Sequence, residues 1–231
     1  MRNAPLLLAL VMITLQAPRA HAQMFSDPLT VAGPRTQVAG VFSASEIEYE
    51  GDGSSDDIDR KILGVEMARG LSGAVDGFAQ LGLIVDSEIG GFDDGQGFTF
   101  GIGGRSVVHK ETAYRVSAYG AFTYQSEEFD EKSIKVELTT YDLHAGAVVG
   151  FNATPVMMPY AGLDLVLLSD GDSKVKIKGG GTYDNDDDDI ERDDILNLKI
   201  GGLFNPATPT VRAEVVLMGE DTFTLAVGTF F

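Results

Sequence analysis

Three side chains in the middle of the sequence have the types and the spacing that general acid–base chemistry requires. Asp142 and His144 are two positions apart, so they share one face if this segment is a β-strand. Asp164 follows in the next segment with the same alternating pattern. A carboxylate beside an imidazole can orient the ring as a general base. No serine is placed as a nucleophile beside His144, so a structural histidine is favoured and the chain is not predicted to be an enzyme.

A second candidate for chemistry is the carboxylate-rich stretch at residues 169–194. It contains Asp170 and Asp172, and four consecutive aspartates at residues 186–189. Oxygen ligands at this density could hold Ca²⁺. However, the spacing does not match an EF-hand loop, which needs a glycine and a twelfth-position glutamate at defined places. We therefore expect a solvated acidic loop, with divalent cations as an alternative partner. The sequence has no cysteine and predicts no cofactor.

The overall charge excludes one class of partner. The sequence has 35 Asp and Glu residues against 17 Lys and Arg, a formal net charge of −18. Nucleic-acid binding requires a basic surface, so no nucleic-acid partner is expected. The acid is also unevenly placed. Residues 50–59, 86–97, 125–134 and 169–194 hold 23 of the acidic residues but only five of the Lys and Arg.

The elements that must position these side chains show a period of two. In the segment 136–151, for example, Leu143 and Ala145 alternate with Asp142 and His144. Such alternation is typical of antiparallel strands with one apolar and one polar face. Ten segments show this pattern: 36–49, 60–71, 78–85, 98–108, 112–124, 136–151, 160–168, 195–204, 211–218 and 222–231. Eight strands are the alternative, because the pattern of the first segment is ambiguous and the last hairpin is short.

The connections between these segments alternate in kind. The first, third, fifth and seventh are acidic and mostly long, whereas the second, fourth, sixth and eighth are short or contain proline. After the N-terminal segment, no stretch approaches the ~18–20 apolar residues of a membrane helix. A chain of this kind can enter a membrane only as a closed barrel. The sequence therefore predicts an all-β fold, an antiparallel up-and-down transmembrane β-barrel with its long loops at one end.

The second face of the predicted strands supplies the lumen of this barrel. It carries both signs of charge, spread over most strands. In a barrel of eight to ten strands the interior is barely wide enough for the side chains that fill it. We therefore predict a packed polar network, and the alternative is a narrow conduit for ions or small solutes. The predicted lumen residues are Glu66, Gln80, Arg105, Arg115, Asp142, His144, Asp164, Asn197, Lys199, Arg212 and Glu214.

The N-terminus has the features of an export signal. Arg2 precedes an apolar stretch at residues 6–13, and Ala20-His21-Ala22 provides a small-residue cleavage pattern. The predicted organisation is a signal peptide at 1–22, an N-terminal periplasmic segment at 23–35 and the barrel at 36–231.

Together with the last ten residues, these features resemble the small outer-membrane β-barrel proteins of Gram-negative bacteria, the OmpA/OmpX-like and porin-like families. The most specific motif is the ending, in which apolar residues recur at every second position and only Thr229 interrupts them. In the family, such an ending is the signal read by the barrel-assembly machinery. Its residues here are Phe223, Leu225, Val227 and Phe231.

The resemblance implies a location in the bacterial outer membrane, with outer-membrane lipid and the barrel-assembly machinery as partners. The first functional hypothesis is a structural or surface-interaction barrel that presents acidic extracellular loops. The alternative is a narrow porin-like channel that prefers cations because its mouth is acidic. A third hypothesis, given low weight, is a barrel enzyme that uses His144.

Overall fold

The structure is a computed structural model that describes residues 35–51, 54–89, 92–131, 134–177, 188–192, 195–204, 209–217 and 220–231. The predicted signal peptide and nearly all of the segment 23–35 lie outside these residues. The described part contains no helix long and apolar enough to cross a membrane.

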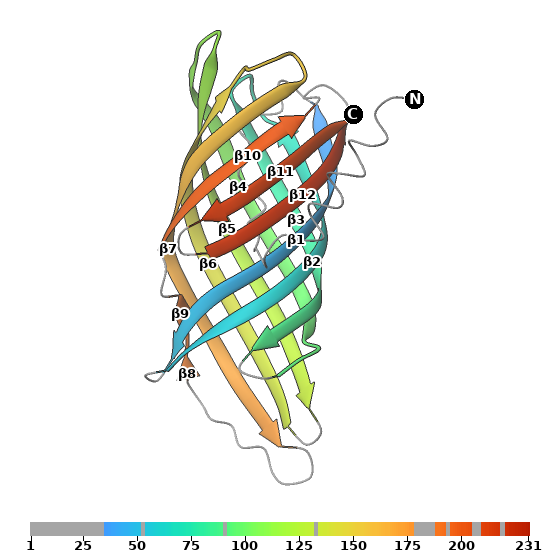
Figure 1. The fold of residues 1–231 in the computed structure, drawn as a ribbon, viewed down its shortest axis with the longest axis vertical. Helices are drawn as coiled ribbons and strands as arrows, with labels where there is room; N and C mark the ends of the chain where they lie inside the picture. The colour runs from blue at the N-terminus through green and yellow to red at the C-terminus, as the bar shows by residue number, and fades with distance from the viewer. Residues whose placement is uncertain are drawn as a thin grey trace.

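Ten long antiparallel strands form one closed barrel (Figure 1). Each strand pairs with the next in the sequence, and β12 pairs with β1 to close the wall. Two short strands, β8 (Asp188–Asp189) and β9 (Glu191–Arg192), pair with β7 and β1 respectively. The long strands are β1 (Thr36–Gly51), β2 (Ser54–Gly70), β3 (Val75–Ile89), β4 (Gln96–Lys110), β5 (Tyr114–Glu131), β6 (Ile134–Phe151), β7 (Met157–Ile177), β10 (Leu196–Phe204), β11 (Thr210–Leu217) and β12 (Glu220–Phe230).

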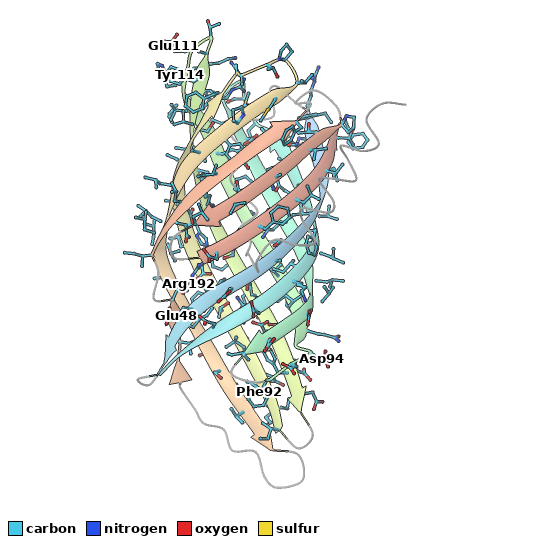
Figure 2. The ribbon with its side chains drawn as sticks, in the orientation of Figure 1. Glu48, Phe92, Asp94, Glu111, Tyr114 and Arg192 are labelled. Atoms are coloured by element: carbon cyan, nitrogen blue, oxygen red, sulfur yellow. The ribbon has the colours of Figure 1, made fainter. Side chains whose placement is uncertain are left out.

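The first and the last residues of the barrel wall lie at the same rim. Thr36 and Phe231 exchange two backbone hydrogen bonds, with N···O distances of 3.2 and 2.8 Å. We call this rim the terminal end, and the opposite rim the loop end. Glu111 and Tyr114 lie at the terminal end, whereas Phe92 and Asp94 lie at the loop end (Figure 2).

These observations confirm the predicted all-β, ten-stranded, up-and-down barrel. The eight-strand alternative is wrong, because the first strand is a full member of the wall. It pairs with β2 along its whole length and with β12 from Gln37 to Ile47.

The predicted strand ends at the loop end are wrong, because four strands, β2, β3, β5 and β7, continue well into the segments predicted to be loops. β5 runs to Glu131 and β7 runs to Ile177, where connections were predicted to begin at Gln125 and Ser169. The reason is that the apolar residues of these strands change from the outer face to the inner face towards the loop end. On β5, Phe122 is exposed on the outside, yet Phe129 is fully buried on the inside.

The same reversal occurs on the neighbouring strand β6. Leu143 is exposed outside, whereas Leu138 is buried inside. A section bathed in water must bury its apolar side chains inward, while a section in lipid turns them outward. The wall therefore has a lipid-facing section and, towards the loop end, a water-facing section.

The lipid-facing section is marked by a belt of exposed apolar side chains. Phe98 and Tyr124 contact one another within it, with ring centroids 5.8 Å apart. The predicted ending of the chain also faces outward, where Val227 and Phe231 are exposed. Other members of the belt are Phe42, Leu63, Val65, Met67, Leu81, Leu83, Ile102, Phe122, Leu143, Leu163, Leu165, Leu196, Ile200 and Leu217.

Candidate functional site: the polar lumen

The structure places the predicted polar residues inside the barrel, where the alternation put them. Arg115 is partly buried and the other ten are buried. These ten are Glu66, Gln80, Arg105, Asp142, His144, Asp164, Asn197, Lys199, Arg212 and Glu214.

Asp164 on β7 is the centre of a polar cluster. Tyr119 from β5 donates its hydroxyl to Asp164 Oδ1 at 2.6 Å, and His144 Nδ1 lies 3.1 Å from Oδ2. From β10, Asn197 Nδ2 donates to Oδ2 at 3.3 Å and Lys199 Nζ lies 3.8 Å from Oδ1. The carboxylate thus joins four strands, and the buried negative charge is neutralised by Lys199.

Glycines opposite the tyrosines make this arrangement possible. Tyr119 is the direct cross-strand neighbour of Gly146, and Tyr160 is that of Gly201. A Cβ atom on either glycine would lie 2.4 Å from the tyrosine ring. Each tyrosine ring therefore lies over the backbone of its glycine neighbour, and its hydroxyl is within hydrogen-bond distance of a carboxylate. Tyr160 donates to Glu214 Oε2 at 2.6 Å.

Two ion pairs lie nearer the terminal end. Arg105 Nε donates to both oxygens of Asp76, at 2.9 and 3.1 Å. Arg212 Nη2 donates to Glu66 Oε2 at 3.0 Å and so joins β11 to β2. All four side chains are buried, so each charge requires its partner.

Two further pairs lie nearer the loop end. Arg60 Nε donates to Glu127 Oε1 at 2.8 Å, and Arg60 Nη1 reaches the Tyr49 hydroxyl at 3.5 Å. Arg192 Nη1 lies 3.6 Å from Asp142 Oδ2. His144 Nε2 lies 4.0 Å from the same oxygen.

The prediction from sequence missed several members of this network. Asp76 and Arg192 fell in predicted connections, and so did Glu127. Tyr119 has the same strand parity as Ser117 and Thr123, so the alternation alone could have placed it in the lumen. Nothing in the local pattern indicated Arg192, because its neighbours in the sequence are acidic and show no periodicity.

The buried charge inside the barrel is close to balanced, although the chain is strongly acidic. Among the described residues, six carboxylates are buried, together with five Arg and Lys side chains. Partly buried Arg115 brings a sixth cation. The excess acid of the chain therefore lies outside this set of buried side chains. The carboxylates are Glu66, Asp76, Glu127, Asp142, Asp164 and Glu214, and the buried cations are Arg60, Arg105, Arg192, Lys199 and Arg212.

Beyond the polar network, the interior of the water-facing section is apolar. Along β2, Ile58 is the next inward residue after Arg60, and along β5 Phe129 is the next after Glu127. Both are fully buried. We call the group to which they belong the loop-end cluster, which consists of Ile47, Tyr49, Ile58, Phe129, Val136 and Leu138, with Ile89, Phe92, Val175 and Ile190 packed against it.

The described residues include no group of three His, Asp or Glu side chains arranged to hold a metal ion. The aspartates at 186 and 187 lie outside the described residues. The contacts that the described lumen side chains make with one another are ion pairs and hydrogen bonds.

Comparison with solved structures places this geometry among known barrels. The outer membrane protease OmpT from Escherichia coli aligns with a TM-score of 0.55 and 8% identity, over 89% of this chain and 99% of that protein. The translocator domain of the autotransporter NalP from Neisseria meningitidis aligns with a TM-score of 0.52 and 10% identity, over 89% and 91%.

The chain has the fold of a bacterial outer-membrane β-barrel. The exposed apolar belt and this fold locate it in the bacterial outer membrane. The sequence matches no protein-family model and no curated protein. The two aligned structures differ in role, one a protease and the other a translocator domain, so the fold alone does not assign an activity.

Proposed function

We propose that this outer-membrane barrel is a non-conducting scaffold, and that its role is to present an acidic surface at the outside of the cell. The observation that carries the proposal is the packing of the lumen. Asp164, Asn197 and Lys199 are 0% exposed although they line the centre of the barrel. A water-filled pore would leave its lining side chains in contact with water.

The loop-end cluster supports the same conclusion. An ion that passed along the polar network would meet Ile58 and Phe129 before it reached the loop end, both of them fully buried. Moving an ion past packed apolar side chains carries a large desolvation cost. The packed loop-end cluster therefore opposes conduction even if the polar residues nearer the terminal end were hydrated.

We further propose that the loop end faces the exterior and the terminal end faces the periplasm. Long outer loops and short periplasmic turns are the arrangement in this class of barrel. In this orientation the acidic connections lie at the cell surface, where cationic groups or divalent cations are the natural partners by charge. Two further partners are proposed. Outer-membrane lipid contacts the outer wall, and the barrel-assembly machinery reads the ending Phe223 to Phe231.

We also propose a structural role for His144. The ring is buried and is held by Asp164 at 3.1 Å, with Asp142 at 4.0 Å on its other nitrogen. A general base needs access to a substrate, and these contacts leave the imidazole committed to the lumen network. The His144→Gln variant should therefore lose stability rather than an activity.

Planar-bilayer recording on the refolded, purified barrel tests the proposal. We expect no discrete conductance steps under conditions in which a known porin conducts. The channel hypothesis would be supported instead by steady steps whose size changes in Glu66→Gln or Arg115→Ala, since both residues belong to the polar lumen. Conductance steps whose size is the same in both variants would indicate leakage around the barrel. A recording with detergent alone is therefore included as a control.

A further inference from the structure

The strands of the wall extend much farther towards the loop end on one side of the barrel than on the other. β5, β6 and β7 continue far past the lipid-facing section, but β10 begins at Leu196, β11 ends at Leu217 and β12 begins at Glu220. Beyond these three short strands, towards the loop end, no full-length strand of the described residues lies between β7 and β1. Figure 1 shows this difference in height between β10–β12 and β5–β7.

The residues Asp188–Arg192 fill the position of the absent strands, and we call them the strap. Their first part pairs with β7, through Asp172↔Asp189 and Ser173↔Asp188. Their last part pairs with β1, through Tyr49↔Arg192 and Glu50↔Glu191. One five-residue segment thus links the two strands and completes the wall of the water-facing section.

Two side chains fix the strap from the inside. Arg192 points to Asp142, and both side chains are at most 3% exposed. Ile190 packs against the loop-end cluster, and its backbone N–H donates to Gly171 O at 3.1 Å. Gly171 must lack a side chain here, because a Cβ atom would lie 2.9 Å from Ile190 Cγ1. Figure 2 shows Arg192 beside β1, near Glu48.

The attachment of the strap is nevertheless slight compared with that of the wall. It shares two register pairs with each neighbour, whereas β1 and β2 share sixteen. Local opening draws on the contacts of the opened segment alone, so it costs less than opening the whole barrel. In the ten-stranded section, nearer the terminal end, β10, β11 and β12 close the wall between β7 and β1, so this section does not depend on the strap.

We propose that the strap is a detachable closure of the loop end, latched by the Arg192–Asp142 ion pair and by Ile190. When it detaches, the loop-end cluster becomes accessible from outside while the ten-stranded section stays closed. The barrel then presents an apolar surface that it hides in the closed state.

Cysteine labelling tests this directly, because the sequence has no cysteine. Leu138→Cys and Ile47→Cys place single thiols in the loop-end cluster, and Ala226→Cys places one on the buried inner face of β12. Each purified, folded barrel is treated with a charged, membrane-impermeant maleimide, and the labelling rate is measured by mass. A matched set carries Arg192→Ala, Ile190→Asn or, as the control, Lys61→Ala, which removes the same charge from an exposed pair.

We expect slow labelling at all three thiols in the parent and in the Lys61→Ala background. Arg192→Ala and Ile190→Asn should each accelerate labelling at residues 138 and 47 by about tenfold or more, because removal of one partner of a buried pair is costly to the closed state. Labelling at residue 226 should not change.

Three results would overturn the proposal. Fast labelling of the cluster thiols in the parent would mean that the strap does not cover them. Unchanged rates in Arg192→Ala and Ile190→Asn would mean that neither contact holds the strap. Acceleration at residue 226 as well would mean that the whole barrel opens.

Discussion

Two adjacent residues on β2 allow the contribution of a buried charge to be separated from that of an exposed one. Arg60 faces the lumen and pairs with Glu127, both buried, whereas Lys61 faces outward and pairs with Asp86, both exposed. Exposed pairs contribute about 0–1 kcal/mol. Breaking a buried pair leaves an uncompensated charge and costs about 3–5 kcal/mol.

We therefore expect Arg60→Ala to lower the free energy of unfolding by about 3–5 kcal/mol, and Lys61→Ala to lower it by less than about 1 kcal/mol. Urea unfolding in detergent measures both free energies. Far-ultraviolet circular dichroism is the probe, because the sequence has no tryptophan. The double variant Arg60→Met/Glu127→Leu should recover much of the loss. Equal effects of the two single variants would contradict the placement of Arg60 in a buried ion pair.

The glycines of the lumen give a second prediction at the residue scale. Gly146→Ala forces a Cβ to within 2.4 Å of the Tyr119 ring, so the ring must move and its hydrogen bond to Asp164 is strained. We expect a loss of about 1–3 kcal/mol, the usual cost of overpacking. Gly40→Ala is the control, since nothing lies within 4 Å of a Cβ there. A neutral Gly146→Ala in the same unfolding assay would show that the lumen has spare room.

At the scale of the element, the loop-end parts of β5, β6 and β7 carry a ladder of partly exposed charges on their outer face. Lys135 Nζ lies 2.8 Å from Glu128 Oε2 and 2.9 Å from Glu137 Oε1, and Lys176 donates to Glu137. The hydrogen bonds from Lys176 and Lys135 hold the pKa of Glu137 below its ordinary value of 4.5. Those to Glu128 and Glu137 raise the pKa of Lys135 above 10.5.

These shifts set the pH window in which the ladder stabilises the pairing of β5, β6 and β7. A lowered carboxyl pKa gives stability that is present above about pH 4.5 and is lost as the pH falls through the lower value in the folded state. A raised amine pKa gives stability that is present below pH 10.5 and is lost as the pH rises through the higher folded value. Amide exchange in residues 134–140, referenced to the intrinsic rate, should therefore accelerate below about pH 4.5. Glu137→Gln should remove this acid dependence, and its persistence in that variant would contradict the assignment.

The elements also show which parts of the fold a sequence can predict. Alternation is a local property, so it placed Asp164 and Lys199 in the lumen and found all ten strands. Partners across the lumen depend on how far each strand is displaced against the next, and this is why Glu66 and Arg212, 146 residues apart, could not be paired in advance. The loop-end strand extensions were missed because the alternation changes its phase there, as Phe122 and Phe129 show on β5.

At the scale of the whole molecule, the proposed orientation predicts which rim is reached from outside an intact cell. Asp130→Cys lies at the loop end and His109→Cys at the terminal end, and both parent side chains are exposed. We expect an impermeant maleimide to label residue 130 in intact cells and residue 109 only after the outer membrane is permeabilised. The reverse pattern would contradict the proposed orientation, and with it the presentation of acidic loops at the cell surface.

The phase reversal along the strands also fixes how deeply the barrel is immersed. On β2 the outward residues change from Leu63 to Lys61 and Asp59 within four positions. If the barrel sank by one such step, these charges would enter hydrocarbon, and if it rose, exposed leucines would enter water. Both displacements are unfavourable, so the water-facing section stands at a set height above the lipid. Whatever contacts the loop end therefore meets it at a constant distance from the membrane surface.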